Sequence, residues 1–164
     1  MKTILVMLVL GAAAYFFYGH LQDRREAQAP KEITNPVYLD VRLEMSVQGR
    51  QFEFALFGKM EGDDDCRNRA DVTWGKIIDG CAGCTKKVST CQATLEPRYA
   101  RLFDDVPINT TYLSLTRGKP TERDGRMVFW GVTSEEGNAV CDLVKQQFAK
   151  NYTGTISCVL ATPQ

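Results

Sequence analysis

The chain has 164 residues, of which 44% are hydrophobic and 24% charged, so it suits one compact domain with a short appendage and excludes two large domains. Twenty basic residues balance twenty acidic residues, and this zero net charge creates no overall field that would attract nucleic acid or an anionic membrane surface. The only histidine, His20, lies in the N-terminal apolar segment. Imidazole-based triads and histidine-rich metal sites are therefore nearly excluded for the folded part.

The N-terminal segment is predicted to be an export signal. After Lys2 the chain is apolar and uncharged, and a helix from Thr3 to Leu21 would be about 28 Å long, just enough to cross a bilayer core of about 30 Å. Cleavage after Ala14 would leave a short leader and a new N-terminus rich in aromatic residues. We therefore predict an uncleaved transmembrane signal-anchor over residues 1–21. A removed signal peptide is the alternative, and both deliver the rest of the chain out of the cytoplasm.

A polar spacer and a folded domain follow the anchor. Residues 22–36 are polar and end at Pro36, which indicates a spacer that holds the domain away from the membrane. The folded domain is then predicted over residues 37–164.

The domain opens with a β-hairpin. Apolar and polar residues alternate strictly over residues 37–47, and the same period returns from Phe52 to Met60. Gly49 and Arg50 fit a two-residue type II′ turn, which would pair Val47 with Phe52 and place all apolar partners on one face.

The rest of the domain is predicted to contain both helices and strands. The spacing of Thr133 and Glu136 is that of a capping box and predicts a helix with Val140, Val144 and Phe148 as its inner stripe, and with Cys141 and Leu143 beside them. We expect, in chain order, a short helix from Cys66 to Gly80, a helical turn from Pro97 with Tyr99, Leu102 and Phe103 facing inward, strands over residues 110–116 and 127–132, a helix over 134–150 and a strand over 155–161. No internal sequence repeat is evident. This order predicts an α+β domain in which a mostly antiparallel sheet of about five strands has helices packed on one face.

The cysteines indicate disulfide bonds. The chain has six: Cys66, Cys81, Cys84, Cys91, Cys141 and Cys158. An even set in an exported domain is typical of disulfides, although sequence alone leaves the connectivity open. Cys141 in the last helix and Cys158 in the last strand form the most readily predicted pair, and a bridge closing that loop would stabilise the fold by about 3 kcal/mol.

The segment from Cys81 to Cys84 allows two further interpretations. Its C-x-x-C spacing is that of thiol-disulfide oxidoreductases, in which Cys81 would be the nucleophile and Cys84 the resolving thiol, with Lys86 or Lys87 lowering the thiol pKa. No thioredoxin-like strand and helix surround the motif, however. Together with Cys66 and Cys91 these cysteines could instead ligate zinc or an iron-sulfur cluster, but a second C-x-x-C is missing. We favour structural disulfides over both alternatives.

The sequence contains no catalytic constellation. It lacks nucleophile motifs, a phosphate-binding loop and a dinucleotide fingerprint, and its acidic pairs are typical of turns and helix ends. Trp74 and Trp130 are interpreted as packing residues, and the polar loop over residues 117–126 as a solvated connection, an anion or partner contact being the alternative. We therefore expect a non-enzymatic, membrane-anchored binding or assembly domain on the periplasmic or extracellular side, which contacts a protein partner of the envelope through its sheet. No cofactor, metal or nucleic acid is expected.

Overall fold

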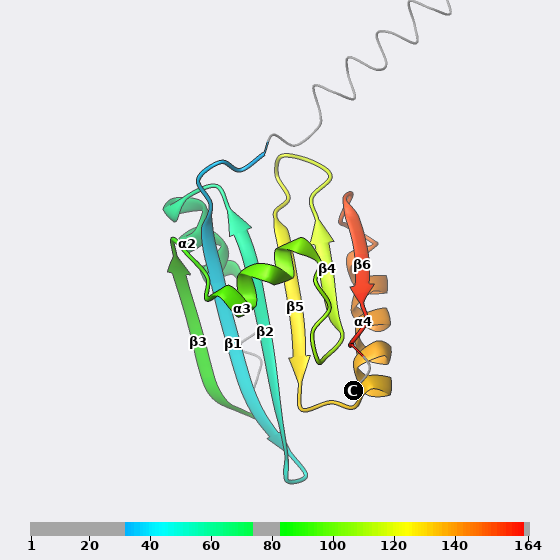
Figure 1. Cartoon of the computed structure of the whole chain (residues 1–164). Helices are drawn as coiled ribbons and strands as arrows, with labels where there is room; N and C mark the ends of the chain where they lie inside the picture. Colours follow the sequence, from blue (N-terminus) through cyan, green and yellow to red (C-terminus); the bar gives the residue numbers. More distant parts are fainter. Residues whose placement is uncertain (1–31, 74–82, 163–164) are drawn as a thin grey trace, which may run out of the picture. The chain divides into compact units, whose positions relative to one another are not determined.

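The computed structural model describes residues 32–73 and 83–162. Their elements are β1 (Val37–Val47), β2 (Arg50–Met60), α2 (Asp63–Thr73), β3 (Cys84–Gln92), α3 (Pro97–Ala100), the 3-10 helix η2 (Arg101–Asp104), β4 (Tyr112–Thr116), β5 (Asp124–Trp130), α4 (Ser134–Phe148) and β6 (Thr155–Val159). The six strands form one antiparallel sheet in the order β3-β1-β2-β5-β4-β6 (Figure 1). The α+β class and the antiparallel sheet are confirmed. The predicted membrane anchor lies outside the described residues.

The first hairpin is confirmed, but its predicted turn and register are wrong. Gln48 and Gly49 form the turn, with φ angles of 51° and 80° that are typical of a type I′ turn. Val47 consequently pairs with Arg50 and not with Phe52. A shift of the partner by two residues leaves every side chain on its original face, so the alternation of apolar residues cannot distinguish the two registers.

The edge strand β3 was not predicted from the sequence. Its residues, CTKKVSTCQ, are mostly polar and lack the alternation that identifies the other strands. It pairs antiparallel with β1, and lysines such as its two are common in edge strands, where they oppose pairing with another chain. The helix predicted from Cys66 begins three residues earlier, at Asp63, where three consecutive aspartates suit the positive end of a helix. Its predicted end at Gly80 lies outside the described residues.

The described domain consists of two halves with the same topology. Each half has two paired strands, a helix and a third strand that returns beside the first: β1-β2-α2-β3, then β4-β5-α4-β6. In each half a disulfide joins the helix to the third strand, Cys66 to Cys91 and Cys141 to Cys158. Cys91 lies opposite Leu39 of β1, and Cys158 lies opposite Leu113 of β4. The repetition is therefore one of topology and disulfide placement, without an evident sequence repeat.

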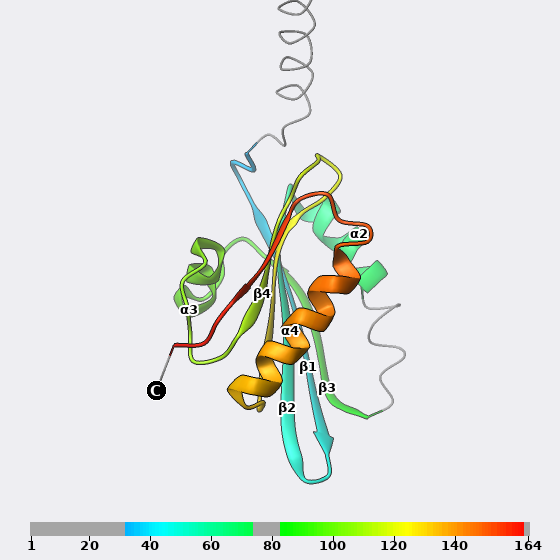
Figure 2. The same cartoon turned by 90° about the vertical axis from the view of Figure 1, so that its right-hand side faces the viewer.

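Helices lie on both faces of the sheet, so the prediction of helices on one face is wrong. α2 and α4 lie on one face, and α3 with η2 lies on the other (Figure 2). The reason is topological: the chain must cross the sheet between the edge strand β3 and β4, and α2 and α4 already occupy the first face. Side chains of β2 alternate between the two layers, since Phe57 belongs to the core beneath α3 whereas Leu56 packs against the cores beneath α2 and α4.

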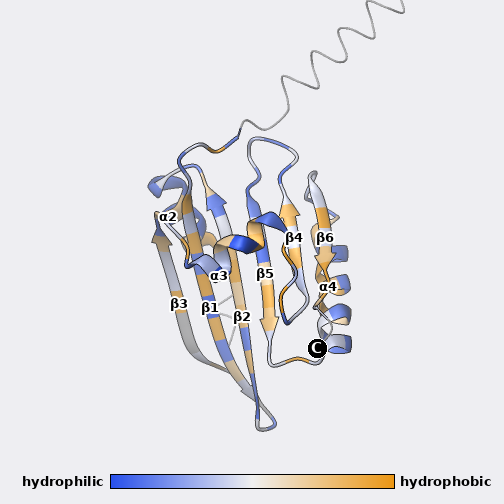
Figure 3. Cartoon of the chain, in the orientation of Figure 1, coloured by the Kyte–Doolittle hydropathy of each residue, from blue (hydrophilic) through white to orange (hydrophobic). Residues whose placement is uncertain are grey.

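The cores follow from this alternation. Figure 3 shows hydrophobic residues on β1, β2, β4, β5 and β6, whereas α2 is largely hydrophilic. Beneath α3 the buried residues are Ala55, Phe57, Leu95, Tyr99, Leu102, Tyr112 and Val128. Beneath α2 they are Leu39, Val41, Leu43, Met60 and Cys66, and beneath α4 they are Leu113, Leu115, Met127 and Cys141. Tyr99 and Leu102 are thus buried as predicted.

The start of the last helix is as predicted from the sequence, but one side chain predicted beside its inner face lies elsewhere. The capping box is present, because the Thr133 side chain accepts from the backbone N–H of Glu136 and the Glu136 side chain accepts from that of Thr133. Cys141 is fully buried, but Leu143 is 58% exposed and does not belong to the inner face. Two residues along a helix correspond to about 200° of rotation, which turns Leu143 away from the sheet.

Candidate functional site

The segment α3–η2 covers only part of its face of the sheet. It crosses in front of β1, β2 and β5 and leaves the ends of these strands that lie toward the β1–β2 turn uncovered (Figure 1). Tyr99 anchors the segment, since its ring stacks on that of Phe57 with centroids 4.6 Å apart and meets that of Trp130 edge-on at 6.3 Å. The boundary between the covered and the open parts therefore runs along Tyr99 and Trp130.

Arg42 is fixed at this boundary as a structural cation. Its guanidinium donates two hydrogen bonds to the Asp40 carboxylate, at 2.9 and 2.8 Å, and one to the Tyr99 hydroxyl at 3.1 Å. It also lies 4.6 Å from the centroid of the Tyr99 ring. The hydrogen bond with Asp40 raises the pKa of Arg42 further above its usual range. The charge of Arg42 is thus already compensated within the fold by the Asp40 carboxylate and the Tyr99 ring.

Two adjoining hollows occupy the open part of this face. The larger, of about 440 Å³, is lined by Tyr99, Leu102, Glu53 and Trp130, among others. The smaller, of about 310 Å³, is lined by Glu44, Glu53 and Trp130, among others. Because they share Glu53 and Trp130, we treat the two hollows together as the Glu53–Trp130 site.

The sheet register brings the polar groups of this site together. Glu53 of β2 lies directly opposite Glu44 of β1 on one side and Trp130 of β5 on the other. Like charges directly opposite each other on neighbouring strands are unfavourable unless something compensates them. The Glu53 side chain is half-buried, and within residues 32–73 and 83–162 its carboxylate makes no hydrogen bond or ion pair.

A second concavity lies on the opposite face, between α2 and α4. Its volume is about 420 Å³, and its floor is apolar, with Leu56, Met60, Leu115 and Met127 among the lining residues. It spans the two halves of the fold. Arg69 and Arg123 at its rim are bound to the carboxylates of Asp65 and Glu61.

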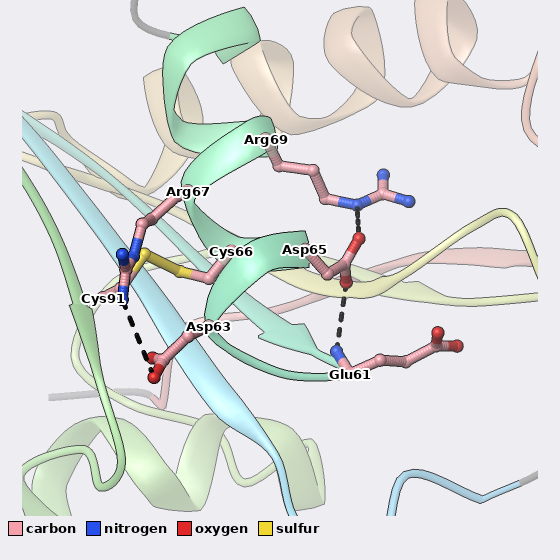
Figure 4. The surroundings of a disulfide bond; sticks show 7 residues. All are labelled: Glu61, Asp63, Asp65, Cys66, Arg67, Arg69 and Cys91. Carbon is pink, nitrogen blue, oxygen red and sulfur yellow. Dashed lines mark hydrogen bonds and ion pairs between the residues drawn. A yellow bond between two sulfur atoms is a disulfide. The ribbon is translucent and has the colours of Figure 1, made fainter.

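Asp65 joins two arginines of that rim, Arg69 and Arg123. It accepts hydrogen bonds from Arg69 at 2.8 Å, from Arg123 at 2.6 Å and from the backbone N–H of Glu61 at 3.0 Å; Figure 4 shows those with Arg69 and Glu61, beside the Cys66–Cys91 disulfide. Burial alone would raise the pKa of Asp65, but these hydrogen bonds outweigh it and lower the pKa to about 2. The network joins α2 to the loop between β4 and β5, which is a structural role.

The polar loop over residues 117–126 is exposed over residues 118–121, as predicted for a solvated connection, but Arg117, Glu122 and Arg126 are buried, and β5 begins within the loop at Asp124. Glu122 is 8% exposed and accepts from the backbone N–H groups of Gly118 and Thr153, at 2.9 and 2.7 Å. Burial would raise the pKa of Glu122, but these hydrogen bonds lower it overall. Arg126 is buried, and its guanidinium donates to four backbone carbonyls. The charges of this loop therefore hold the fold together.

The cysteines are oxidised in the described part of the chain. The predicted bond between Cys141 and Cys158 is confirmed, and Cys66 pairs with Cys91. Cys84 is also disulfide-bonded and is the first residue of β3, whereas a reactive C-x-x-C motif lies at a helix N-terminus. Cys81 lies outside the described residues. No group of three metal-ligating side chains occurs within residues 32–73 and 83–162.

Sequence reasoning did not identify the Glu53–Trp130 site. Glu53 is an ordinary polar position of an alternating strand, and Trp130 was interpreted as a packing residue. The signal was present in the hairpin, because the register with Gln48 and Gly49 in the turn places Glu44 opposite Glu53. The register predicted with Gly49 and Arg50 in the turn separates the two carboxylates.

Comparison of the chain with models of protein families, with curated proteins and with solved structures finds no match. Within the part of the chain that the structure describes, no helix is long and apolar enough to cross a membrane.

Proposed function

We propose that this chain is a membrane-anchored binding domain that is exported from the cytoplasm and contacts a protein partner through the Glu53–Trp130 site. The observation that carries the proposal is the pair of adjoining hollows on the open part of the sheet, which share a half-buried carboxylate and an aromatic side chain. Concave sites with aromatic walls and a few polar groups are the usual form of binding sites in proteins.

The location is supported by the cysteines and by the N-terminal segment. Disulfides persist in oxidising compartments such as the periplasm and the cell exterior, and two of them join helix to strand in this domain. The apolar segment over residues 1–21 has the length and the early lysine of a signal-anchor. A single-pass anchor would present the folded domain on the outer side of the membrane.

A binding role has more support than the two alternatives. A thiol-disulfide oxidoreductase would use Cys81 and Cys84, but Cys84 is the first residue of a strand, whereas a reactive C-x-x-C motif lies at a helix N-terminus. A cysteine-ligated metal module would need the thiolates of Cys66 and Cys91, and those two sulfurs are bonded to each other.

The binding face can be tested by photocrosslinking from single positions. A photoreactive amino acid is introduced into the full chain at Gln51, an exposed residue that lines the smaller hollow, or at Asp71, an exposed residue of α2. α2 lies on the opposite face, so Asp71 is a matched control. In native membranes we expect one discrete product from Gln51, lost when Trp130 is replaced by Leu in a variant with an unchanged melting temperature. Identical products from both positions, or none from Gln51, would contradict the proposal.

A further inference from the structure

We propose that the Glu53–Trp130 site takes a positively charged side chain, a guanidinium or ammonium group, from a basic segment of the partner polypeptide. This inference rests on the proposed function, because it names the partner chemistry of the same site. It follows from the charges, from the aromatic rings and from an arrangement that the protein itself repeats nearby.

The arginines around the site already have carboxylate partners. Arg42 is bound to Asp40 at 2.8 Å, and Arg98, which lines the larger hollow, is bound to Glu96 at 2.9 Å. Arg50, near the turn, is bound to Glu136 by two hydrogen bonds. Arg42 also interacts electrostatically with Glu53, but among the described residues the Glu53 carboxylate has no hydrogen-bond or ion-pair partner, so it is the charged group of the site that is open to a cation.

The same face shows how this protein holds a cation. The guanidinium of Arg42 lies between a carboxylate, that of Asp40, and the ring of Tyr99, 4.6 Å from the ring centroid. Arg98 repeats the arrangement, since it is bound to Glu96 and lies 4.4 Å from the same ring centroid. A carboxylate beside an aromatic ring attracts a cation by charge and by the negative face of the ring.

The Glu53–Trp130 site has two parts of this arrangement and lacks the third. Glu53 supplies the carboxylate and Trp130 supplies the ring, directly across the β2–β5 pair. Tryptophan is the aromatic residue that binds cations best. Glu44 lines the smaller hollow, but it lies directly opposite Lys86 of β3 and already has an interaction within the fold, so Glu53 is the carboxylate on which the inference depends. Arg42 and Arg98, the arginines on this side of the sheet near the site, are bound to Asp40 and Glu96, and neither forms an ion pair with Glu53.

The form of the site favours a polypeptide over a small free amine. Two hollows of about 440 and 310 Å³ share a wall, which suits neighbouring side chains of one extended segment. Ile108, which is partly exposed, lines the larger hollow and can cover the aliphatic stem of a lysine or arginine.

The test uses the full chain in detergent micelles and a short peptide, acetyl-Gly-Arg-Gly-Arg-Gly-amide. The matched control peptide carries citrulline in place of arginine, which keeps the shape and removes the charge. Binding is followed by the indole N–H resonance of Trp130, assigned with a Trp130→Phe variant. We expect saturable shifts with the arginine peptide, at least fivefold weaker binding when NaCl rises from 50 to 300 mM, and no saturation with the citrulline peptide.

Two variants locate the binding group. Glu53→Gln removes the charge with little change of shape and is expected to weaken binding of the arginine peptide at least fivefold, whereas Asp71→Asn on the opposite face leaves it unchanged. Equal binding of the two peptides, or an unchanged affinity of Glu53→Gln, would overturn the inference. If crosslinking from Gln51 still captures a partner in that case, the binding face stands and only the cationic ligand is wrong.

Discussion

Arg126 shows how much of this fold depends on one buried cation. Its side chain is 3% exposed, and its guanidinium donates to the carbonyls of Leu102 and Phe103 in η2 and of Leu115 and Gly125 in the sheet, besides pairing with Asp105 at 3.0 Å. Burial lowers the pKa of Arg126 below its usual value, which is so high that the group stays charged. This side chain holds η2 to the sheet, in addition to the packing of Tyr99 and Leu102, and so supports the wall of the Glu53–Trp130 site.

Replacement of Arg126 by Met should therefore be among the most damaging single changes. It leaves four backbone carbonyls without their donor, and we expect the free energy of unfolding to fall by about 3 kcal/mol or more. Arg126→Lys should recover only part of the loss, because an ammonium group cannot reach all four acceptors. Urea unfolding checks this, with Arg98→Met as the control, since that side chain is 66% exposed. A change below about 1 kcal/mol for Arg126→Met would contradict the account.

Asp65 gives the fold a defined sensitivity to acid. Its pKa is about 2 in the folded protein, against 3.8 for the free group, because its hydrogen bonds with Arg123 and Arg69 outweigh the effect of burial. A pKa that is lower in the folded state contributes stability above the unfolded value, and this stability is lost as pH falls toward the folded value. We expect Asp65→Asn to lower the free energy of unfolding by about 1 to 2 kcal/mol near neutral pH, and the difference from wild type to shrink between about pH 4 and pH 2. Asp64→Asn, at an exposed position, is the control. A pH-independent difference would contradict the assignment.

The β1–β2 hairpin depends on two residues with positive φ. Gly49 has a φ of 80° and open space around a would-be Cβ, so Gly49→Ala costs only backbone strain, about 1 kcal/mol. Gln48 has a φ of 51°, which Asn tolerates better, so Gln48→Asn should raise the free energy of unfolding by roughly 0.5 kcal/mol. Thermal unfolding measures whether Gly49→Ala lowers the stability and whether Gln48→Asn raises it. If Gln48→Asn proves destabilising, the turn does not lie at Gln48 and Gly49.

Comparison of the predicted and observed elements shows which signals sequence carries. The capping box at Thr133 and the alternation of β1 and β2 are local patterns, and these elements were predicted correctly. The turn of the hairpin was not, because a shift of two residues preserves the hydrophobic faces. β3 was missed because its stability comes from pairing with β1 and not from its own composition. The candidate site depends on the register of the hairpin and on the path of α3 across the sheet. Neither is encoded in a local sequence pattern, so the site is evident only in the folded chain.

At the scale of the molecule, two halves of one topology share a sheet, and each is closed by its own disulfide. The bond between Cys66 and Cys91 spans 25 residues, and that between Cys141 and Cys158 spans 17. Loops of similar length should contribute similar stability. We expect each double replacement by Ala to lower the free energy of unfolding by about 3 kcal/mol, measured by urea unfolding without reductant. A loss confined to one pair would show that only one half depends on its bond.

The central claim is that the domain folds and works in an oxidising compartment outside the cytoplasm. The most direct measurement traps free thiols in intact cells with a membrane-permeant alkylating agent and then maps the peptides without reduction by mass spectrometry. The account predicts peptides linked through Cys66 and Cys91 and through Cys141 and Cys158, with none of these four residues alkylated. Alkylation of all four in the native protein would contradict both the location and the structural role of the disulfides.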